Sequence, residues 1–328
     1  MRVRVLFHDN CFDGAASAAL FTRFHAARVA PGADYVYRGL THHPGQVFPN
    51  GAFDGDENAV VDFRYHRSER LTWWFDHHVS AFSSPADEAH FRADTSGRKF
   101  FDPTSPSCTQ VIGRVAAERF GFDLAPYGEL LEWARIIDGA QFDSARTAVA
   151  LEQPALKLMT WVEANRDPAL TERFIRALGT TPLDAIAAEP WVQEPLVPLL
   201  AQHQRSIAVL QRRARLEHGV VSFDVGDDEI EAWNKFIIYD LFPDSRYSVG
   251  VSHSRTRAKV SVGTNPWARE QRTHNIATIC ARYGGGGHPV VGAVSLGQGE
   301  LERARQIARE IVAELQGPPH PEYATPGA

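Results

Sequence analysis

The sequence has few cysteines and no long apolar run. Its three cysteines, Cys11, Cys108 and Cys280, are far apart and form no CxxC pair. This argues against a disulfide framework and against a zinc ribbon, and it favours a reducing, cytoplasmic setting. No segment approaches the roughly 20 apolar residues that a membrane-spanning helix needs. We therefore expect a soluble protein that does not contact a membrane.

The sequence also lacks a long run of basic residues. Lysine and arginine total 34 against 40 acidic residues, for a net charge of -6. Packaging of nucleic acid and a grip on a long duplex are therefore not expected, although a local basic groove stays open. With 44% hydrophobic and 23% charged residues, the composition is that of an ordinary globular protein. A length of 328 residues predicts two domains.

The first part of the chain alternates between short apolar runs and helical patterns. Apolar runs predict strands at residues 3–7, 35–38, 59–63 and 71–75, and alanine-rich residues 15–24 predict a helix after the first strand. Two further helices are predicted at 108–120, capped by Ser107, and at 127–137. This order is typical of an α/β fold with a mostly parallel sheet flanked by helices.

The second part of the chain begins with a long helical pattern at residues 199–217, which we interpret as a connector. Strands are then predicted at 220–225, 230–233, 247–253 and 258–262, the last two as a hairpin. A helix at 275–283, a strand at 290–296 and a helix at 301–315 complete a smaller α/β domain. The predicted limits are 1–190 for the first domain, 191–218 for the connecting helix, 219–317 for the second domain and 318–328 for a disordered tail.

Four polar motifs are expected at or just beyond strand ends: HDNCFDG, VVDF, FDHH and IIDGAQFD. The carboxyl ends of strands line the ligand crevice in open α/β sheets, so these motifs could converge. Carboxylates combined with imidazoles suit Mn²⁺ or Mg²⁺, and a pair of such ions can activate water and neutralise a phosphoryl group.

Each motif also has a purely structural interpretation. Asp62 could cap a turn, and His8 could be a satisfied histidine at a strand end. The run Asp76, His77 and His78 is harder to explain by packing, because three titratable residues directly follow an aromatic strand.

A glycine run, GGGG followed by His288, precedes the last predicted strand. Successive glycines allow a backbone to approach an anion closely and to point several N–H groups at it. A flexible loop with an incidental histidine is the alternative interpretation.

FDHH after VVDF, preceded by HxNCxDG and followed far downstream by GGGGH, resembles the DHH/DHHA1 phosphoesterases. This superfamily includes RecJ-type exonucleases, nanoRNA and pAp phosphatases, and cyclic-di-AMP phosphodiesterases. The resemblance spans residues 8 to about 296 and implies a DHH catalytic domain and a DHHA1-like domain that grips the substrate.

The resemblance implies a role for each matching residue. Asp62 would bridge two Mn²⁺ ions, with Mg²⁺ as an alternative. Asp13, His77 and Asp138 would complete one ion's ligands, and His8 would join Asp62 on the other. Asp138 is preferred to Asp143 because IIDGAQF resembles the family's Asp-Thr-Gly-x-Phe pattern. The catalytic residues would be Asp76, which supports the metal site, and His78, which contacts the substrate phosphate. Gly285, Gly286, Gly287 and His288 would hold the distal part of the substrate.

The sequence departs from the family pattern in two places. Relatives usually carry Asp-x-Asp in the first motif, whereas this chain has Cys11 and Asp13. A cysteine is a poor ligand for a hard cation. The site shared with His8 could therefore be weaker, be occupied differently, or be coordinated by Asp9 or Asn10 instead. Many nanoRNases carry an arginine shortly after the strand that here reads KVSV. In this chain Arg255 or Arg257 could substitute, Asn265 could read a base or sugar, and Trp267 could stack on a base or serve packing.

The expected function is a Mn²⁺-dependent phosphoesterase that hydrolyses phosphodiester or phosphomonoester bonds by metal-activated water. Its expected substrates are short oligonucleotides or small nucleotides. An inorganic pyrophosphatase or exopolyphosphatase is one alternative, and a non-catalytic nucleotide-binding module is another. Formation of a homodimer stays open.

Overall fold

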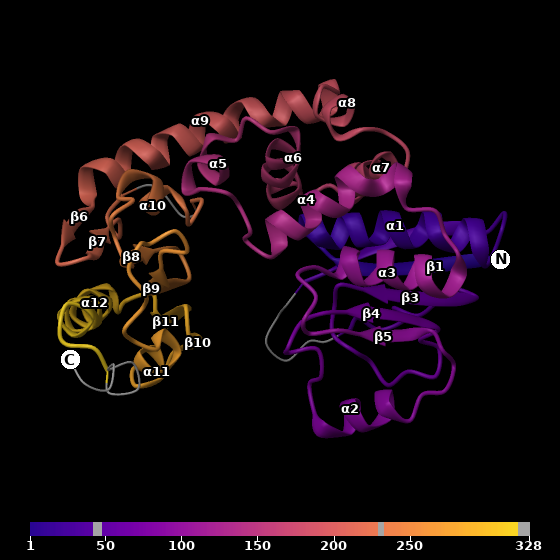
Figure 1. The fold of residues 1–328 in the computed structure, drawn as a ribbon, viewed down its shortest axis with the longest axis horizontal. Coiled ribbons are helices and arrows are strands. Elements are labelled where there is room, and N and C mark those ends of the chain that lie inside the picture. The colour runs from indigo at the N-terminus through magenta and orange to yellow at the C-terminus, as the bar shows by residue number, and fades with distance from the viewer. Residues whose placement is uncertain (42–47, 229–232, 321–328) are drawn as a thin grey trace. The chain divides into compact units, whose positions relative to one another are not determined.

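The computed structural model describes residues 1–41, 48–228 and 233–320. The chain divides into two compact units (Figure 1). The first unit comprises Met1–Phe142 and Leu151–Val197, and the second comprises Asp143–Ala150 and Pro198–Ala328. Among the described residues, no helix is both long enough and apolar enough to cross a membrane.

The first unit contains the strands β1 (Arg2–His8), β2 (Asp34–Leu40), β3 (Glu57–Val61), β4 (Trp73–Asp76) and β5 (Lys99–Phe101). Its helices are α1 (Phe12–Arg28), α2 (Pro85–Arg92), α3 (Cys108–Phe120), the 3₁₀ helix η1 (Ala125–Tyr127), α4 (Gly128–Asp138), α6 (Pro154–Ala164), α7 (Pro168–Leu178) and α8 (Leu183–Ala187). The five strands pair in the order β2-β1-β3-β4-β5, and every pair is parallel. The predicted α/β fold with a parallel sheet is therefore confirmed.

Aromatic residues of β4 pack on both faces of this sheet because successive side chains of a strand alternate in direction. Trp73 and Phe75 contact Phe21 of α1 at ring-centroid distances of 6.0 Å each. Trp74 points to the opposite face and lies 4.8 Å from the ring of Tyr65. In Figure 1, α1 and α3 cover one face of the sheet, and α2 lies on the other side. The sheet is thus buried on both faces, as expected for parallel strands.

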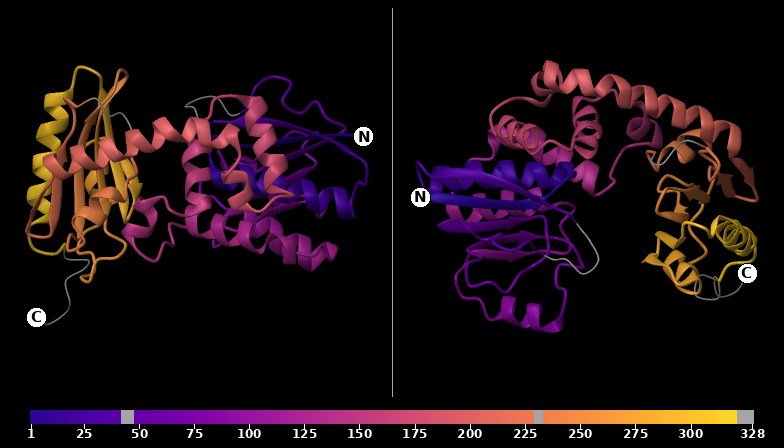
Figure 2. Two further views of the ribbon diagram at one scale, coloured as in Figure 1. Left: turned by 90° about the horizontal axis from the view of Figure 1, so that it is seen from above. Right: turned by 180° about the vertical axis from the view of Figure 1, so that it is seen from behind.

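The second unit contains a six-stranded mixed sheet in the order β10-β11-β9-β8-β7-β6. Its strands are β6 (Arg215–Glu217), β7 (Val220–Asp224), β8 (Tyr247–His253), β9 (Arg257–Thr264), β10 (Gly286–His288) and β11 (Val291–Gly297), and its helices are α5 (Ala145–Ala150), α10 (Ile237–Leu241), α11 (Ile276–Ala281) and α12 (Leu301–Leu315). The predicted hairpin is present as the antiparallel pair β8 and β9. Figure 2 shows α12 lying along one face of this sheet, where Ile307 and Ile311 are buried against Val249 and Val260.

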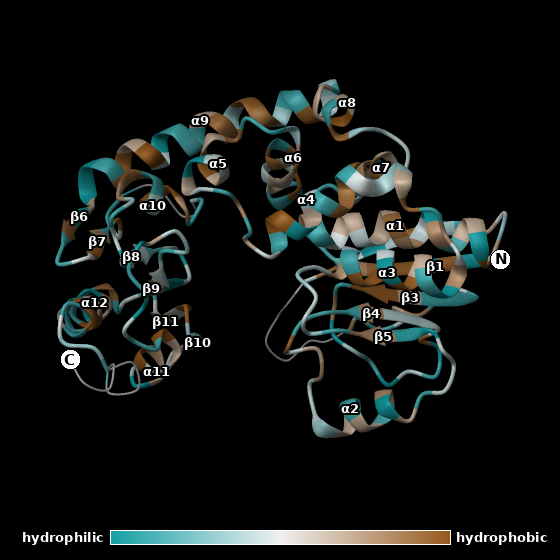
Figure 3. Ribbon diagram, viewed as in Figure 1, coloured by the Kyte–Doolittle hydropathy of each residue, from teal (hydrophilic) through white to brown (hydrophobic). Residues whose placement is uncertain are grey.

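The helix α9 (Pro190–Arg213) crosses the boundary between the two units along the chain. It starts earlier than the predicted helix at 199–217 and ends earlier, because Arg215–Glu217 pairs with β7 as the edge strand β6. The expectation of helix up to Glu217 was therefore wrong. Hydrophobic and hydrophilic colours alternate along α9 in Figure 3, and its buried Val192 and Leu196 are one helical turn apart.

The glycine run also differs from the expected loop. Gly286–His288 forms β10, which pairs with β11. A Cβ atom on Gly285 or on Gly287 would lie 2.2 Å from a carbonyl oxygen of β11. Close contact with β11 therefore explains these two glycines, whatever else the run binds. Of the other expectations, the strand at 230–233 falls largely, and the tail at 318–328 mostly, outside the described residues.

Candidate metal centre

Three neighbouring parallel strands bring polar residues to one edge of the first sheet. His8 ends β1, Asp62 directly follows β3, and Asp76 ends β4. Phe7 pairs with Val61 and Val61 pairs with Phe75, so the three strands end side by side. Asp62 adopts a left-handed backbone conformation (φ 56°), which turns the chain sharply after β3. The predicted convergence at the carboxyl ends of the strands is therefore present.

The Asp62 carboxylate lies in the middle of this edge, and its side chain is only 1% exposed. It is 3.4 Å from His8 Nδ1, 3.6 Å from His77 Nε2 and 3.7 Å from His78 Nδ1. Neither of its oxygens has a hydrogen-bond partner among the described residues. Burying a carboxylate without hydrogen bonds is unfavourable in free energy, so this position favours a bound cation.

His77 connects Asp62 to two further carboxylates. Its Nε2 atom is 3.2 Å from Asp138 Oδ2 and 4.0 Å from Asp13 Oδ2. On the other side of the ring, Nδ1 lies 3.0 Å from the Ser105 carbonyl oxygen. A carbonyl can only accept, so Nδ1 carries the proton and donates it there. In the neutral ring, the Nε2 lone pair then faces the carboxylates, as in histidines that bind a metal.

Asp13 is held in place by the start of α3. One of its oxygens accepts a hydrogen bond from Cys108 N (2.7 Å), and the other accepts bonds from Thr109 N (3.1 Å) and Thr109 Oγ1 (2.6 Å). The N-terminus of a helix favours a negative charge, which suits a carboxylate there. Gly14 allows α1 to start so close to β1, because a Cβ atom there would lie 2.0 Å from the His8 carbonyl oxygen.

Asp76 orders the two histidines that follow it. Its Oδ1 atom accepts hydrogen bonds from the backbone N–H of His77 (2.8 Å) and of His78 (3.2 Å), and it lies 2.8 Å from His78 Nδ1. Asp76 is fully buried, whereas the side chain of His78 is 34% exposed. Asp76 therefore positions His77 and His78, and His78 is the more accessible of these residues.

The electrostatics of the cluster reflect a surplus of negative charge. Burial opposes ionisation of Asp62, but the His77 and His8 imidazoles outweigh it and hold the Asp62 pKa at about 2. Burial lowers the pKa of His77, yet Asp138, Asp62 and Asp13 raise it overall to about 11. Burial and the charges of Asp62 and Asp138 raise the pKa of Asp13. Without a metal, His77 therefore carries a proton on both ring nitrogens and a positive charge. A divalent cation bound here would supply the positive charge instead.

Three overlapping groups in the described part of the chain could each hold a metal ion: His8, Cys11 and Asp62; Asp62, His77 and His78; and Asp13, His77 and Asp138. Within each group the ligand atoms lie within 4.8 Å of one another. Asp62 belongs to two of the groups, and the two oxygens of one carboxylate can serve two ions, which is compatible with a two-metal site. Carboxylates and imidazoles of this kind fit divalent cations such as Mn²⁺.

Of the two aspartates considered for the last ligand, only Asp138 belongs to these groups. Asp138 ends α4, and its side chain is 24% exposed. Asp143 is exposed and belongs to the second unit.

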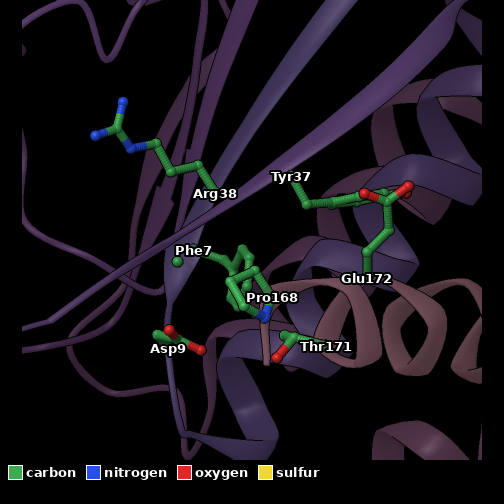
Figure 4. Close-up of a pocket in the computed structure, with 8 residues that line it drawn as sticks. Phe7, Asp9, Tyr37, Arg38, Pro168, Thr171 and Glu172 are labelled. Atoms are coloured by element: carbon green, nitrogen blue, oxygen red, sulfur yellow. The ribbon is translucent and has the colours of Figure 1, made fainter. Parts of the chain in front are cut away.

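The first motif contains Asp9 and Asn10, the two suggested replacements for Cys11, and both are engaged elsewhere. The Asp9 side chain packs on Gly39, where a Cβ atom would lie 2.4 Å from its carboxyl group. It lines a pocket of about 190 Å³ together with Phe7 and Pro168 (Figure 4). The Asn10 amide donates to the carbonyl oxygens of Asn165 (2.7 Å) and Val162 (3.3 Å).

The residues predicted to bind substrate lie in the second unit. Four of them are exposed, namely Arg257, Gly286, Gly287 and His288. Gly285 is partly buried. Asn265 is buried, and its amide donates to the carbonyl oxygens of Ser245 (2.8 Å) and Pro243 (3.2 Å). Both amide hydrogens thus hold the local backbone, and we do not retain Asn265 as a reader of a base or sugar. Trp267 packs on Phe236 at a ring-centroid distance of 5.4 Å.

Sequence reasoning missed two contributors to the centre. Thr109 was not singled out, because a threonine in the first turn of a helix carries no signal that it meets a residue 96 positions away. Cys11 was treated as a poor ligand, although it lies in one of the three groups. The unusual cysteine in an otherwise acidic motif was the available signal.

The fold is similar to those of a solved DHH domain and of RecJ, so the fold that the resemblance implies is confirmed. No protein-family model matches the sequence, and no curated protein matches it either. Solved structures do match. The chain is similar to a pGpG-specific phosphodiesterase, PggH of Vibrio cholerae, with a TM-score of 0.68 and 22% identity over 95% of this chain and 99% of that one.

Two other similar structures agree with this fold. A DHH domain from a protein described as a member of a family of ribosomal proteins has a TM-score of 0.57 and 12% identity, over 96% of this chain and 88% of its own. RecJ of Thermus thermophilus, solved with Mn²⁺, has a TM-score of 0.53 and 15% identity. The match covers 97% of this chain but only 52% of that RecJ, so this chain spans about half of its length.

Proposed function

We propose that this protein is a metal-dependent phosphoesterase that hydrolyses phosphodiester or phosphomonoester bonds of short oligonucleotides or small nucleotides. The observation that carries this proposal is the buried Asp62 carboxylate, which lies beside three histidines and accepts no hydrogen bond from the described residues. In two-metal hydrolytic sites the ions lie roughly 3.5–4 Å apart, a separation at which one carboxylate can serve both.

Some residues of the site would bind cations, and Asp76 would position the histidines beside them. Asp62 would serve two ions, with Asp13, His77 and Asp138 completing the ligands of one and His8 joining Asp62 on the other. We infer that Mn²⁺ binds where the donors are carboxylates and an imidazole, as in the group of Asp13, His77 and Asp138. When bound, two divalent cations lower the pKa of a water molecule and neutralise phosphoryl charge. Asp76 keeps His78 oriented, and His78 lies at the exposed rim, where it can meet a substrate phosphate.

The proposed substrates are small. The similar PggH structure is that of a pGpG-specific phosphodiesterase, and pGpG is a linear dinucleotide. The net charge of -6 disfavours a salt-dependent grip on many phosphates of a long strand. In the second unit, His288 is exposed and ends the glycine run, so it would bind the distal phosphate or sugar. Arg257 is also exposed, but it pairs with Gly297, at the far end of β11 from Val291, the partner of His288. The three cysteines are free thiols, which supports a reducing cytoplasm as the place of action.

A panel of substrates tests the proposal. The full chain is incubated with Mn²⁺ and with 5′-labelled di- to pentanucleotides, pGpG, pApA, pAp, cyclic-di-AMP and pyrophosphate, beside the Asp62→Ala variant. We expect the wild-type protein to cleave at least one dinucleotide. Loss of the shared carboxylate removes several kcal/mol of stabilisation of the transition state, so Asp62→Ala should be slower by about a thousandfold or more.

Other outcomes point to the alternative functions. Release of phosphate from pyrophosphate alone would favour a pyrophosphatase. Nucleotide binding without turnover, by a protein shown to contain its metals, would contradict the enzyme and favour a binding module.

A further inference from the structure

Cys11 occupies an unusual place at the start of α1. It is the residue that caps this helix, but its side chain makes no capping hydrogen bond. Its Sγ atom instead lies within 4.8 Å of the ligand atoms of His8 and Asp62. The Asp62 carboxylate is buried and has no hydrogen-bond partner among the described residues, so an independent observation marks the same place as a cation site.

The other polar residues of the motif cannot supply this ligand without rearrangement. Asp9 packs on Gly39, and its Oδ1 atom accepts a hydrogen bond from the Asn10 backbone N–H at 2.9 Å. The Asn10 side chain donates hydrogen bonds to two carbonyl oxygens at the end of α6. Cys11 is therefore the third donor beside His8 and Asp62.

We propose that Cys11 is a direct metal ligand, and that the group of His8, Cys11 and Asp62 binds a thiophilic divalent cation such as Zn²⁺ or Co²⁺ in preference to Mg²⁺. The proposal rests on the metal-dependent function proposed above and refines it. Sulfur, nitrogen and oxygen donors together select softer ions, whereas carboxylates without sulfur do not. The group of Asp13, His77 and Asp138 has no sulfur, so the two halves of the centre differ in the ion that they prefer.

The distances are compatible with one ion bound by all three side chains. Zinc bonds of about 2.3 Å to sulfur and about 2.0 Å to nitrogen or oxygen, at tetrahedral angles, put ligand atoms about 3.5 Å apart. The present atoms lie within 4.8 Å, so the longest separation needs to shorten by at most about 1.3 Å. Rotation of the partly exposed His8 and Cys11 side chains is sufficient for this.

Cobalt spectroscopy on the full chain tests the ligand directly. The protein is freed of metal with a chelator and titrated with Co²⁺ alone, while the near-ultraviolet absorption band of a thiolate-to-cobalt charge transfer is recorded. The wild-type protein should show this band, and Cys11→Ser should lack it. Cys108→Ser is the matched control, because Cys108 is a nearby buried thiol that donates to the Phe75 carbonyl oxygen, and it should keep the band.

Competition titrations give the expected size of the effect. Loss of a hydrogen-bonded supporting residue already lowers metal affinity 10- to 100-fold, and loss of a direct ligand costs no less. Cys11→Ser should therefore lower Zn²⁺ affinity by about tenfold or more while changing Mg²⁺ affinity far less. Equal losses for both ions would contradict the proposal, as would a charge-transfer band that survives in Cys11→Ser.

A measurement on the wild-type protein guards against a variant that does not fold. Cys11 is partly exposed, whereas Cys108 and Cys280 are buried, so a thiol reagent should modify Cys11 first. Zn²⁺ should slow this modification, as mapped by mass spectrometry, and Mg²⁺ should not. Equal rates with and without Zn²⁺ would sink the proposal.

The two proposals fail in different ways. If the wild-type protein hydrolyses nucleotides with Mn²⁺ but shows no cobalt–thiolate band with Co²⁺ bound, the Cys11 ligand is wrong and the phosphoesterase stands. If the band is present and no substrate is cleaved, the ligand is right and the proposed function is wrong.

Discussion

The two units use their conspicuous motifs in different ways. In the first unit, Asp62 is buried next to three histidines and has no hydrogen-bond partner in the described structure, so local packing does not explain it. In the second unit, Gly285 and Gly287 are explained by close contact with β11, and Asn265 by its bonds to the backbone. A motif is thus stronger evidence for chemistry when the fold leaves its polar atoms without partners.

The largest expected effect is a loss of Mn²⁺ binding, and it is measured by comparing an aspartate of the first unit with one of the second. Asp138→Ala removes a carboxylate 3.2 Å from His77 and should weaken binding of Mn²⁺ about a hundredfold or more. Asp143→Ala is the matched control, because Asp143 is exposed and lies outside the three groups. Calorimetric titration of both variants measures this difference. A comparable loss in Asp143→Ala would show that the ligand was chosen wrongly.

A smaller effect is expected for a residue that positions a ligand. Thr109→Val keeps the shape of the side chain but removes the hydroxyl that donates to Asp13 at 2.6 Å. Metal affinity should fall about 10- to 100-fold, and the fold should lose about 1.5–3 kcal/mol because a buried charged group loses a donor. Thr109→Ser retains the hydroxyl and should restore most of both. If Thr109→Val and Thr109→Ser have the same metal affinity and the same free energy of unfolding in urea, the hydroxyl does not position Asp13.

The glycine run offers a test of packing against ligand binding. Gly287→Ala places a Cβ atom 2.2 Å from the Val291 carbonyl oxygen at φ 152°, and should destabilise the protein by about 1–3 kcal/mol. Gly286→Ala meets no atom within 4 Å and should change stability by less than about 0.5 kcal/mol. Denaturant unfolding compares the two. An increase in KM for Gly286→Ala at unchanged stability would add a ligand contact to the packing role.

The smallest effect concerns a histidine of the first unit that lies outside the centre. Burial lowers the pKa of His25, although Glu57 partly opposes this. The folded state therefore binds a proton at His25 less readily than the unfolded chain, so this residue stabilises the fold above the ordinary histidine pKa of about 6.5. That contribution declines as the pH falls below this value, through the folded pKa.

His25→Phe isolates the contribution. The change removes the titrating ring and its bonds to Tyr35 (2.8 Å) and Glu57 (3.0 Å), so the variant should be less stable at pH 7.5. Between pH 7 and pH 5, however, its free energy of unfolding should fall less steeply than that of the wild type. Parallel curves from urea unfolding would exclude a role of His25 in acid sensitivity.

Much of the fold could be predicted because its signals are local. The helix at 108–120 and its cap were predicted from Ser107, and the structure has Ser107 accepting the Gln110 N–H. The strand β8 and the helix α12 have the predicted bounds. The short strand β5 was missed because three residues carry no readable period. The helix α2 was missed because only Asp87 of its eight residues is buried, so it has no apolar stripe.

The sequence by itself determined which residues stand at the ends of the strands, because alternating apolar runs mark where a buried strand stops. It therefore named His8, Asp62, Asp76 and His77, whereas Asp138, which ends α4, was named from a resemblance to a family motif. Only the tertiary structure decided which of these atoms meet, that Thr109 holds Asp13, and that Cys11 joins the cluster while Asp9 turns to Gly39. These contacts join distant segments, or depend on the direction of one side chain in a turn, and no local pattern encodes either.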